Sequence, residues 1–68
     1  MITLISETLG AVYTLEDDVL FYTPLNKDGS FSNSIEDFVE VDHMALLGEE
    51  EFIRQEVDRV ESLLRANI

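Results

Sequence analysis

The sequence contains no cysteine and only four basic residues, and both shortages exclude classes of function. Without cysteine there are no disulfides, no thiolate metal sites and no cysteine nucleophiles. A chain of 68 residues buries only about 60% of its unfolded surface, so its stability is marginal without a staple. Because disulfides are absent, a partner subunit is the staple that we expect first.

Long apolar runs are also missing, and none approaches the roughly 20 residues that span a bilayer. The first ten residues hold no base and only a short apolar patch, which is unlike a secretory signal. We therefore expect a cytoplasmic protein. The chain begins with Met1 and has the length of one small acidic domain. We expect that domain to span residues 1–68, with a β-rich part at 1–48 and a helix at 49–67.

The shortage of bases leaves a net charge of −11, from fifteen acidic residues against four basic ones. Such a chain repels nucleic acid and anionic membranes, because phosphate binding needs clustered Lys and Arg. A basic protein surface is the partner that this charge favours, although the charge also serves solubility alone. Residues 1–48 hold nine acids and one base, so the negative charge is concentrated before the C-terminal helix.

A helix is predicted over residues 49–66, because apolar residues recur there with a helical period. Gly48 is the expected N-cap, which places Glu51 third in the helix and lets Leu47 pack on Phe52. Glu56 interrupts the apolar stripe, and we expect it to lie at the edge of the stripe with Arg59. The stripe itself comprises Phe52, Ile53, Val57, Val60, Leu63 and Leu64.

A β-hairpin is predicted over residues 11–23, with Asp17 and Asp18 as its two-residue loop. That register places one set of apolar residues on each face of the hairpin. One face carries Tyr13, Leu15, Leu20 and Tyr22, and the other carries Val12, Thr14, Val19, Phe21 and Thr23.

Residues 37–42, "DFVEVD", are the expected third strand, and residues 2–5 are a weaker candidate for an edge strand. The predicted fold is therefore α+β: a small antiparallel three-stranded β-meander with one C-terminal amphipathic α-helix packed on it. One helix covers only one face of the hairpin. The N-terminal segment, the "HMALLG" stretch (residues 43–48) or a second copy of the chain must cover the other face.

One stretch resembles a calcium-binding loop but is better interpreted as a turn. Asn26, Asp28 and Gly29 fit part of a calcium loop, but Pro24 and Ile35 fall where ligands are required. We expect a turn at Asp28-Gly29 instead, with glycine supplying positive φ.

The single histidine, His43, has acidic neighbours but no nucleophile placed beside it. We expect no catalytic residue, no bound metal and no cofactor.

The sequence therefore favours a non-enzymatic protein-binding module, expected to form a homodimer. The apolar residues expected to serve self-association or partner binding are Val12, Val19, Phe21, Ile53, Val57, Val60 and Leu64. In the helix they follow a 4-3-4 spacing that suits either a helix–helix seam or, as we favour, packing on the sheet.

The alternative is a nucleic-acid mimic that occupies a basic surface of a host protein. Small acidic proteins of this composition are frequent in bacteriophages, so a phage-type inhibitor is one form of this hypothesis. The acidic surface expected to carry it comprises Glu16, Asp17, Asp18, Glu36, Asp37, Glu40 and Asp42.

Overall fold

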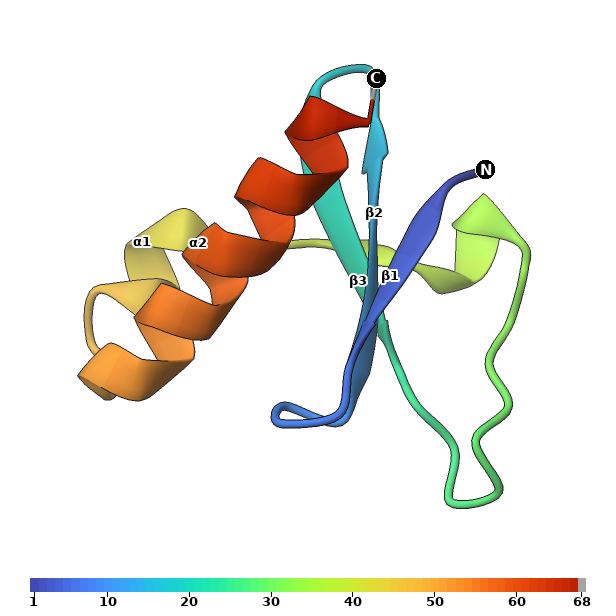
Figure 1. Cartoon of the computed structure of the whole chain (residues 1–68), viewed down its shortest axis with the longest axis horizontal. Helices are drawn as coiled ribbons and strands as arrows, with labels where there is room; N and C mark the ends of the chain where they lie inside the picture. Colours follow the sequence, from blue (N-terminus) through green and yellow to red (C-terminus); the bar gives the residue numbers. More distant parts are fainter. Residues whose placement is uncertain (68) are drawn as a thin grey trace.

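The computed structural model describes residues 1–67 and contains a four-stranded antiparallel sheet with helices on one face (Figure 1). The strands follow chain order across the sheet, and the predicted α+β class is confirmed. They are β1 (Thr3–Ser6), β2 (Ala11–Glu16), β3 (Val19–Pro24) and the short β4 (Val39–Glu40). The weak expectation of an N-terminal edge strand is met by β1. No helix within residues 1–67 is both long and apolar enough to cross a bilayer.

The β2–β3 hairpin has the predicted register, with Leu15 opposite Leu20 and Tyr13 opposite Tyr22. Its loop residues Asp17 and Asp18 have φ angles of 52° and 64°. Two successive positive φ values are those of a type I′ turn, whose twist matches that of the flanking strands. Aspartate tolerates this left-handed region better than most residues, so the acidic loop suits a tight hairpin.

The C-terminal helix, α2 (Glu51–Ala66), packs its apolar stripe on one face of the sheet. Val57, Val60 and Leu64 are buried there against side chains of β2, β3 and Val41. The prediction that this helix packs on the sheet is confirmed, although Phe52 and Leu63 of the predicted stripe are 54% and 41% exposed. Burial of each such side chain contributes about 1.5–3 kcal/mol to stability.

Glu56 lies at the edge of the stripe with Arg59, as predicted, and its carboxylate also ties α2 to the sheet. Arg59 donates from Nε and Nη2 to the two carboxylate oxygens, at 2.7 and 2.8 Å. The Ser6 hydroxyl at the end of β1 donates to Oε2 at 2.7 Å. Hydrogen bonds from Arg59, and then from Ser6, lower the pKa of Glu56 to about 2.

The start of α2 differs from the prediction. The N-cap is Glu50, with no side-chain capping bond, and Glu51 is the first residue of the helix. Gly48 belongs instead to the turn that precedes it, where its N–H donates to the carbonyl of Ala45. Leu47 and Phe52, expected to pack together at this point, are both exposed. The cause is an additional helix just upstream, which uses Leu47 as its own C-cap.

That additional helix, α1 (His43–Leu46), was not predicted as a helix. The third predicted strand is correspondingly shorter, because β4 has only residues 39 and 40. After β4, the Val41 N–H donates to the carbonyl of Leu20 at 2.9 Å, and Asp42 then begins α1. In Figure 1, α1 lies beside α2 on the same side of the sheet.

The second face of the sheet is covered in part within the chain, since Val12 is buried there whereas Ile5, its neighbour on β1, is 44% exposed. Residues 25–38 run along the side of the sheet opposite the helices, including a short 3₁₀ helix, η1 (Ile35–Asp37) (Figure 1). Val12 and Thr14 are both 0% exposed on this face, and Phe38 is buried. The Thr14 hydroxyl donates to the carbonyl of Ile2 at 2.6 Å, so its burial leaves no unpaired polar group.

The Asp28-Gly29 segment is a turn, as predicted. Gly29 has a φ of 85°, and the Asn26 N–H donates to the Ser30 carbonyl at 2.9 Å. Asp28 Oδ1 accepts from the Ser30 hydroxyl at 2.6 Å and from the Ser30 N–H at 3.0 Å. These bonds, the hydroxyl first, lower the pKa of Asp28. The carboxylate thus stabilises the turn itself.

Candidate interaction surface

Helix α1 is fixed at both ends, although it has only four residues. At its start, Asp42 Oδ1 accepts from the N–H groups of Met44 and Ala45 at 3.0 and 3.2 Å. At its end, Leu46 packs on the edge of the core between sheet and α2. A helix held in this way presents its remaining side chains to solvent in a defined orientation.

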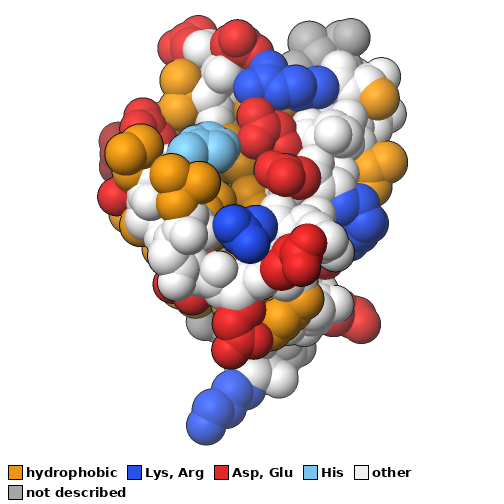
Figure 2. Space-filling view, turned by 90° about the vertical axis from the view of Figure 1, so that its left-hand side faces the viewer, with side chains coloured by type: hydrophobic (Ala, Val, Ile, Leu, Met, Phe, Trp, Pro, Cys, Tyr) orange, Lys and Arg blue, Asp and Glu red, His pale blue; other side chains and the backbone are white. Residues whose placement is uncertain are grey.

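Two large apolar side chains, Met44 and Leu47, point away from the core and are 76% and 66% exposed. They are the two most exposed large hydrophobic residues among residues 1–67, and we call them the α1 knob. In Figure 2, apolar side chains gather beside the histidine on the helix side of the molecule, with acidic side chains around them. Clustered exposed apolar groups of this kind are typical of binding surfaces.

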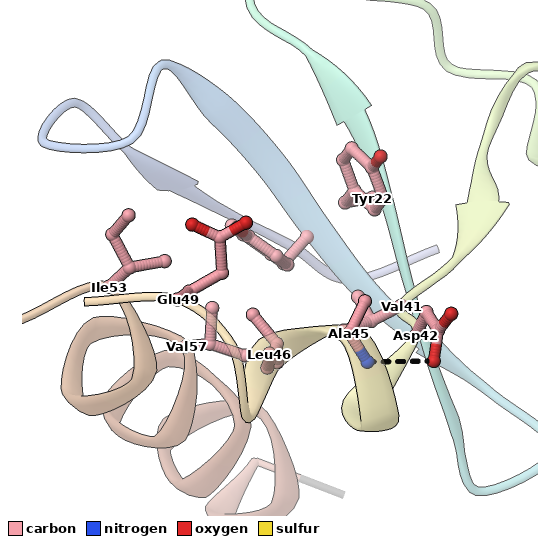
Figure 3. A pocket seen from close by; sticks show the side chains of 9 residues that line it. Tyr22, Val41, Asp42, Ala45, Leu46, Glu49, Ile53 and Val57 are labelled. Carbon is pink, nitrogen blue, oxygen red and sulfur yellow. Dashed lines mark hydrogen bonds between the residues drawn. The ribbon is translucent and has the colours of Figure 1, made fainter. Parts of the chain in front are cut away.

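One flank of α1 forms a pocket of about 190 Å³ between α1, the start of α2 and strands β2 and β3 (Figure 3). We call it the tyrosine pocket. In Figure 3, Glu49 and Tyr22 reach into this space from opposite sides, and Leu46 and Val57 lie on the helix side. The lining residues are Tyr13, Tyr22, Val41, Asp42, Ala45, Leu46, Glu49, Ile53 and Val57.

The two tyrosine rings stand side by side on β2 and β3. Their centroids are 6.1 Å apart and the rings are tilted by 34°, a separation within the favourable range for aromatic pairs. Tyr13 is 5% exposed, and Tyr22 is more open. Burial, followed by the charges of Tyr22 and Glu56, raises the pKa of Tyr13. Both rings are therefore fixed parts of the pocket wall.

The other flank of α1 forms a groove against α2, of about 210 Å³. It is lined by His43, Leu46, Leu47, Arg54 and Asp58. The Nε of Arg54 is buried there with no hydrogen-bond partner among residues 1–67. An unpaired buried donor is costly, which marks this groove as less completely packed than the core.

A charged network joins α1, the end of α2 and the β2–β3 turn. Arg65 donates to Glu61 and to Asp18, and His43 Nε2 lies 3.2 Å from Glu61 Oε1. Burial tends to raise the pKa of Glu61, but the hydrogen bonds from Arg65 and His43 outweigh it and lower the pKa. A pocket of about 250 Å³ opens between these groups.

The network places the His43 ring beside the Glu61 carboxylate at the solvent-exposed end of α2. Its side chain is 56% exposed, and its carboxylate neighbour is already bound by Arg65. Within residues 1–67, no three His, Asp or Glu side chains gather in a metal-binding arrangement.

The apolar residues predicted for interaction lie mostly inside the chain. Four of the seven are buried in its own core: Val12 on the second sheet face, and Val57, Val60 and Leu64 on α2. Val19, Phe21 and Ile53 are partly buried, and Ile53 lines the tyrosine pocket. Four of these side chains are thus not available on the surface of this structure.

The seven residues of the predicted acidic surface are all exposed. Three of them have structural partners: Asp18 pairs with Arg65, Asp37 accepts from the Ser32 hydroxyl, and Asp42 caps α1. The other four are Glu16, Asp17, Glu36 and Glu40, which have no ion pair within residues 1–67.

Met44, Leu47 and Glu49 are not among the interaction residues predicted from the sequence. A signal for α1 does exist in the sequence, because an aspartate before "HMAL" is a typical N-cap. Four residues are too few to show a helical period, so the stretch was considered only as a cover for the sheet.

Comparisons of the chain with models of protein families, with curated proteins and with solved structures found no match.

Proposed function

We propose that this chain is a non-enzymatic protein-binding module that docks a partner protein on α1. The observation that carries the proposal is the α1 knob, whose two side chains are 76% and 66% exposed on a helix that is capped and anchored. Burying both side chains against a partner is worth about 1.5–3 kcal/mol each, enough to centre an interface. Methionine adapts well to irregular partner surfaces.

The charge around the knob indicates what kind of partner fits. Glu49, Glu50 and Asp58 are exposed close to α1 in sequence or across the groove, and the whole chain carries −11. A partner with basic residues around an apolar centre matches this surface. We place the interaction in the cytoplasm, as proposed from the sequence.

Affinity capture with matched variants tests the proposal. We expect a protein captured by the wild type to be lost when the knob is replaced by Met44→Ser with Leu47→Ser. The control is the double variant Ile2→Thr with Val39→Thr. It alters two exposed apolar side chains outside α1, which are 57% and 54% exposed. Equal capture by the knob variant and the wild type would refute docking on α1.

The homodimer stays a prediction. Of the residues expected at its interface on the second sheet face, Val12 is fully buried within one chain, whereas Val19 and Phe21 are partly exposed. At −11 per chain, self-association must overcome like-charge repulsion, so a dimer should tighten as salt is added. Light scattering at low and high salt measures this directly.

A nucleic-acid mimic is the second candidate, favoured by the four exposed acidic residues without an ion pair: Glu16, Asp17, Glu36 and Glu40. Salt distinguishes the two mechanisms. Capture through the apolar knob should persist when salt is raised, whereas capture by charge alone should fall steeply. A basic protein that is released by salt and unaffected by the knob variant would favour mimicry.

A further inference from the structure

We propose that the tyrosine pocket receives one lysine or arginine side chain of the partner protein. The inference rests on the proposed function and adds the chemistry by which the partner is recognised. The pocket lies on the flank of α1 where Ala45 and Leu46 line it, so a partner on the knob can reach it.

The volume of the pocket is suited to a single side chain rather than to a larger ligand. Its volume is about 190 Å³, whereas pockets for drug-sized ligands and cofactors measure about 300–1,000 Å³. A cavity of about 150 Å³ accommodates a group as large as benzene. The stem and head group of one long side chain are of this order.

The walls suit an apolar stem with a cationic end. Val41, Leu46, Ile53 and Val57 line the pocket and offer contacts for the methylene groups of lysine or arginine, which readily lie along apolar surface. The face of the more open ring, Tyr22, adds an attraction for a cation within about 6 Å.

Glu49 supplies the opposite charge. Its carboxylate reaches into the pocket from the segment between α1 and α2 (Figure 3). No ion pair or side-chain hydrogen bond engages it within residues 1–67, where the four salt bridges use Asp18, Glu56 and Glu61. A cation entering the pocket would pair with a carboxylate that has no competing partner.

The same features disfavour other side chains. A neutral apolar side chain would remove water from Glu49 without offering it a hydrogen bond, which is unfavourable. An acidic side chain would meet both Glu49 and the −11 charge of the chain. Lysine and arginine combine a long apolar stem for the walls with a positive charge for the carboxylate.

Titration of the full chain with N-acetyl-lysine-N-methylamide, followed by NMR, tests the pocket directly. We expect saturable shifts at Tyr22, Ile53 and Val57, and weaker shifts with the uncharged N-acetyl-norleucine-N-methylamide. Glu49→Gln should weaken the lysine probe about three- to tenfold, the range for one partly exposed charged contact. Glu50→Gln is the matched control, because it removes the same charge one residue away and outside the pocket.

Two results would overturn the inference that the pocket binds a cationic side chain. One is that the norleucine probe binds as tightly as the lysine probe. The other is that Glu49→Gln and Glu50→Gln weaken binding of the lysine probe equally. The capture experiment separates this failure from that of the proposed function. If the partner needs the knob but the lysine probe does not bind the pocket, the proposed function holds and the pocket inference fails. If the lysine probe binds as expected but the knob variant captures the partner as well as the wild type does, the proposal of docking on α1 is wrong. The pocket is then still a site for a cationic side chain.

Discussion

Replacing Val12 with alanine tests whether the chain covers both faces of its sheet by itself. Val12 is 0% exposed on the face covered by residues 25–38, and Val60 is 0% exposed on the face covered by α2. If both are core residues of a single chain, Val12→Ala and Val60→Ala should destabilise it similarly and independently of protein concentration.

The magnitude follows from the atoms removed. Valine to alanine deletes two buried carbon groups, worth about 0.8 kcal/mol each in transfer free energy. Incomplete collapse of the cavity adds to this, so each variant should lose about 2–3 kcal/mol. A chain of 68 residues has about 3–10 kcal/mol of stability in total, so the loss is a large part of it.

Urea unfolding at ~5 and ~200 μM chain is the measurement, since stability that depends on association rises with concentration. Val39→Ala is the matched control, because Val39 is 54% exposed and the same deletion there should cost under about 1 kcal/mol. The reasoning is refuted if Val12→Ala behaves like Val39→Ala. It is also refuted if the wild-type midpoint rises with concentration and Val12→Ala abolishes the rise, because a partner would then cover that face.

Three further predictions concern single carboxylates. Glu56→Gln should cost about 1–3 kcal/mol at neutral pH. Because the pKa of Glu56 is lowered from 4.5 to about 2, this contribution is present above pH 4.5 and lost as the pH falls towards 2, where urea unfolding of wild type and variant should converge. Asp17→Ala should cost about 1 kcal/mol and Asp17→Gly less, measured by thermal unfolding, because the φ of 52° disfavours alanine. Calorimetry with calcium should show no binding tighter than ~1 mM at Asp28, whose Oδ1 accepts two bonds from Ser30. The first prediction is contradicted if the difference in stability between wild type and Glu56→Gln does not change with pH. The second is contradicted if the two Asp17 variants lose equal stability, and the third if calcium binds more tightly than ~1 mM.

The hairpin and the C-terminal helix were predictable because their signals are local. A two-residue acidic loop between strands fixes the register, and that register alone decides that Tyr13 and Tyr22 share a face. The helical period of the apolar residues was enough to predict the buried face of α2. Glu56 could be assigned to the edge of this face because burying an unpaired carboxylate is costly.

The cover of the second sheet face could not be predicted in the same way. Residues 25–38 have neither a helical nor a strand period, so nothing local indicates that this segment packs on the sheet. Its path depends on where its two ends are held, by β3 on one side and by the buried Phe38 on the other. The homodimer expectation was argued from this face and stays a prediction, because Val12 is buried there within one chain while Ile5 on the same face is 44% exposed.

The scarcity of basic residues is informative once their positions are known. Arg59 and Arg65 are both used inside the chain, the first to hold Glu56 beside Ser6 and the second to join α2 to the β2–β3 turn. The Ser6–Glu56 hydrogen bond and the Arg65–Asp18 ion pair join the helix layer to the sheet. The charges of Arg59 and Arg65 are therefore neutralised where they lie, whereas Arg54 lines the groove between α1 and α2 on the flank of α1 away from Glu49. Glu49 keeps an unpaired carboxylate at the mouth of an apolar pocket, beside the two most exposed apolar side chains of the described chain. A partner that brings its own cation to this point supplies the charge that the sequence itself lacks.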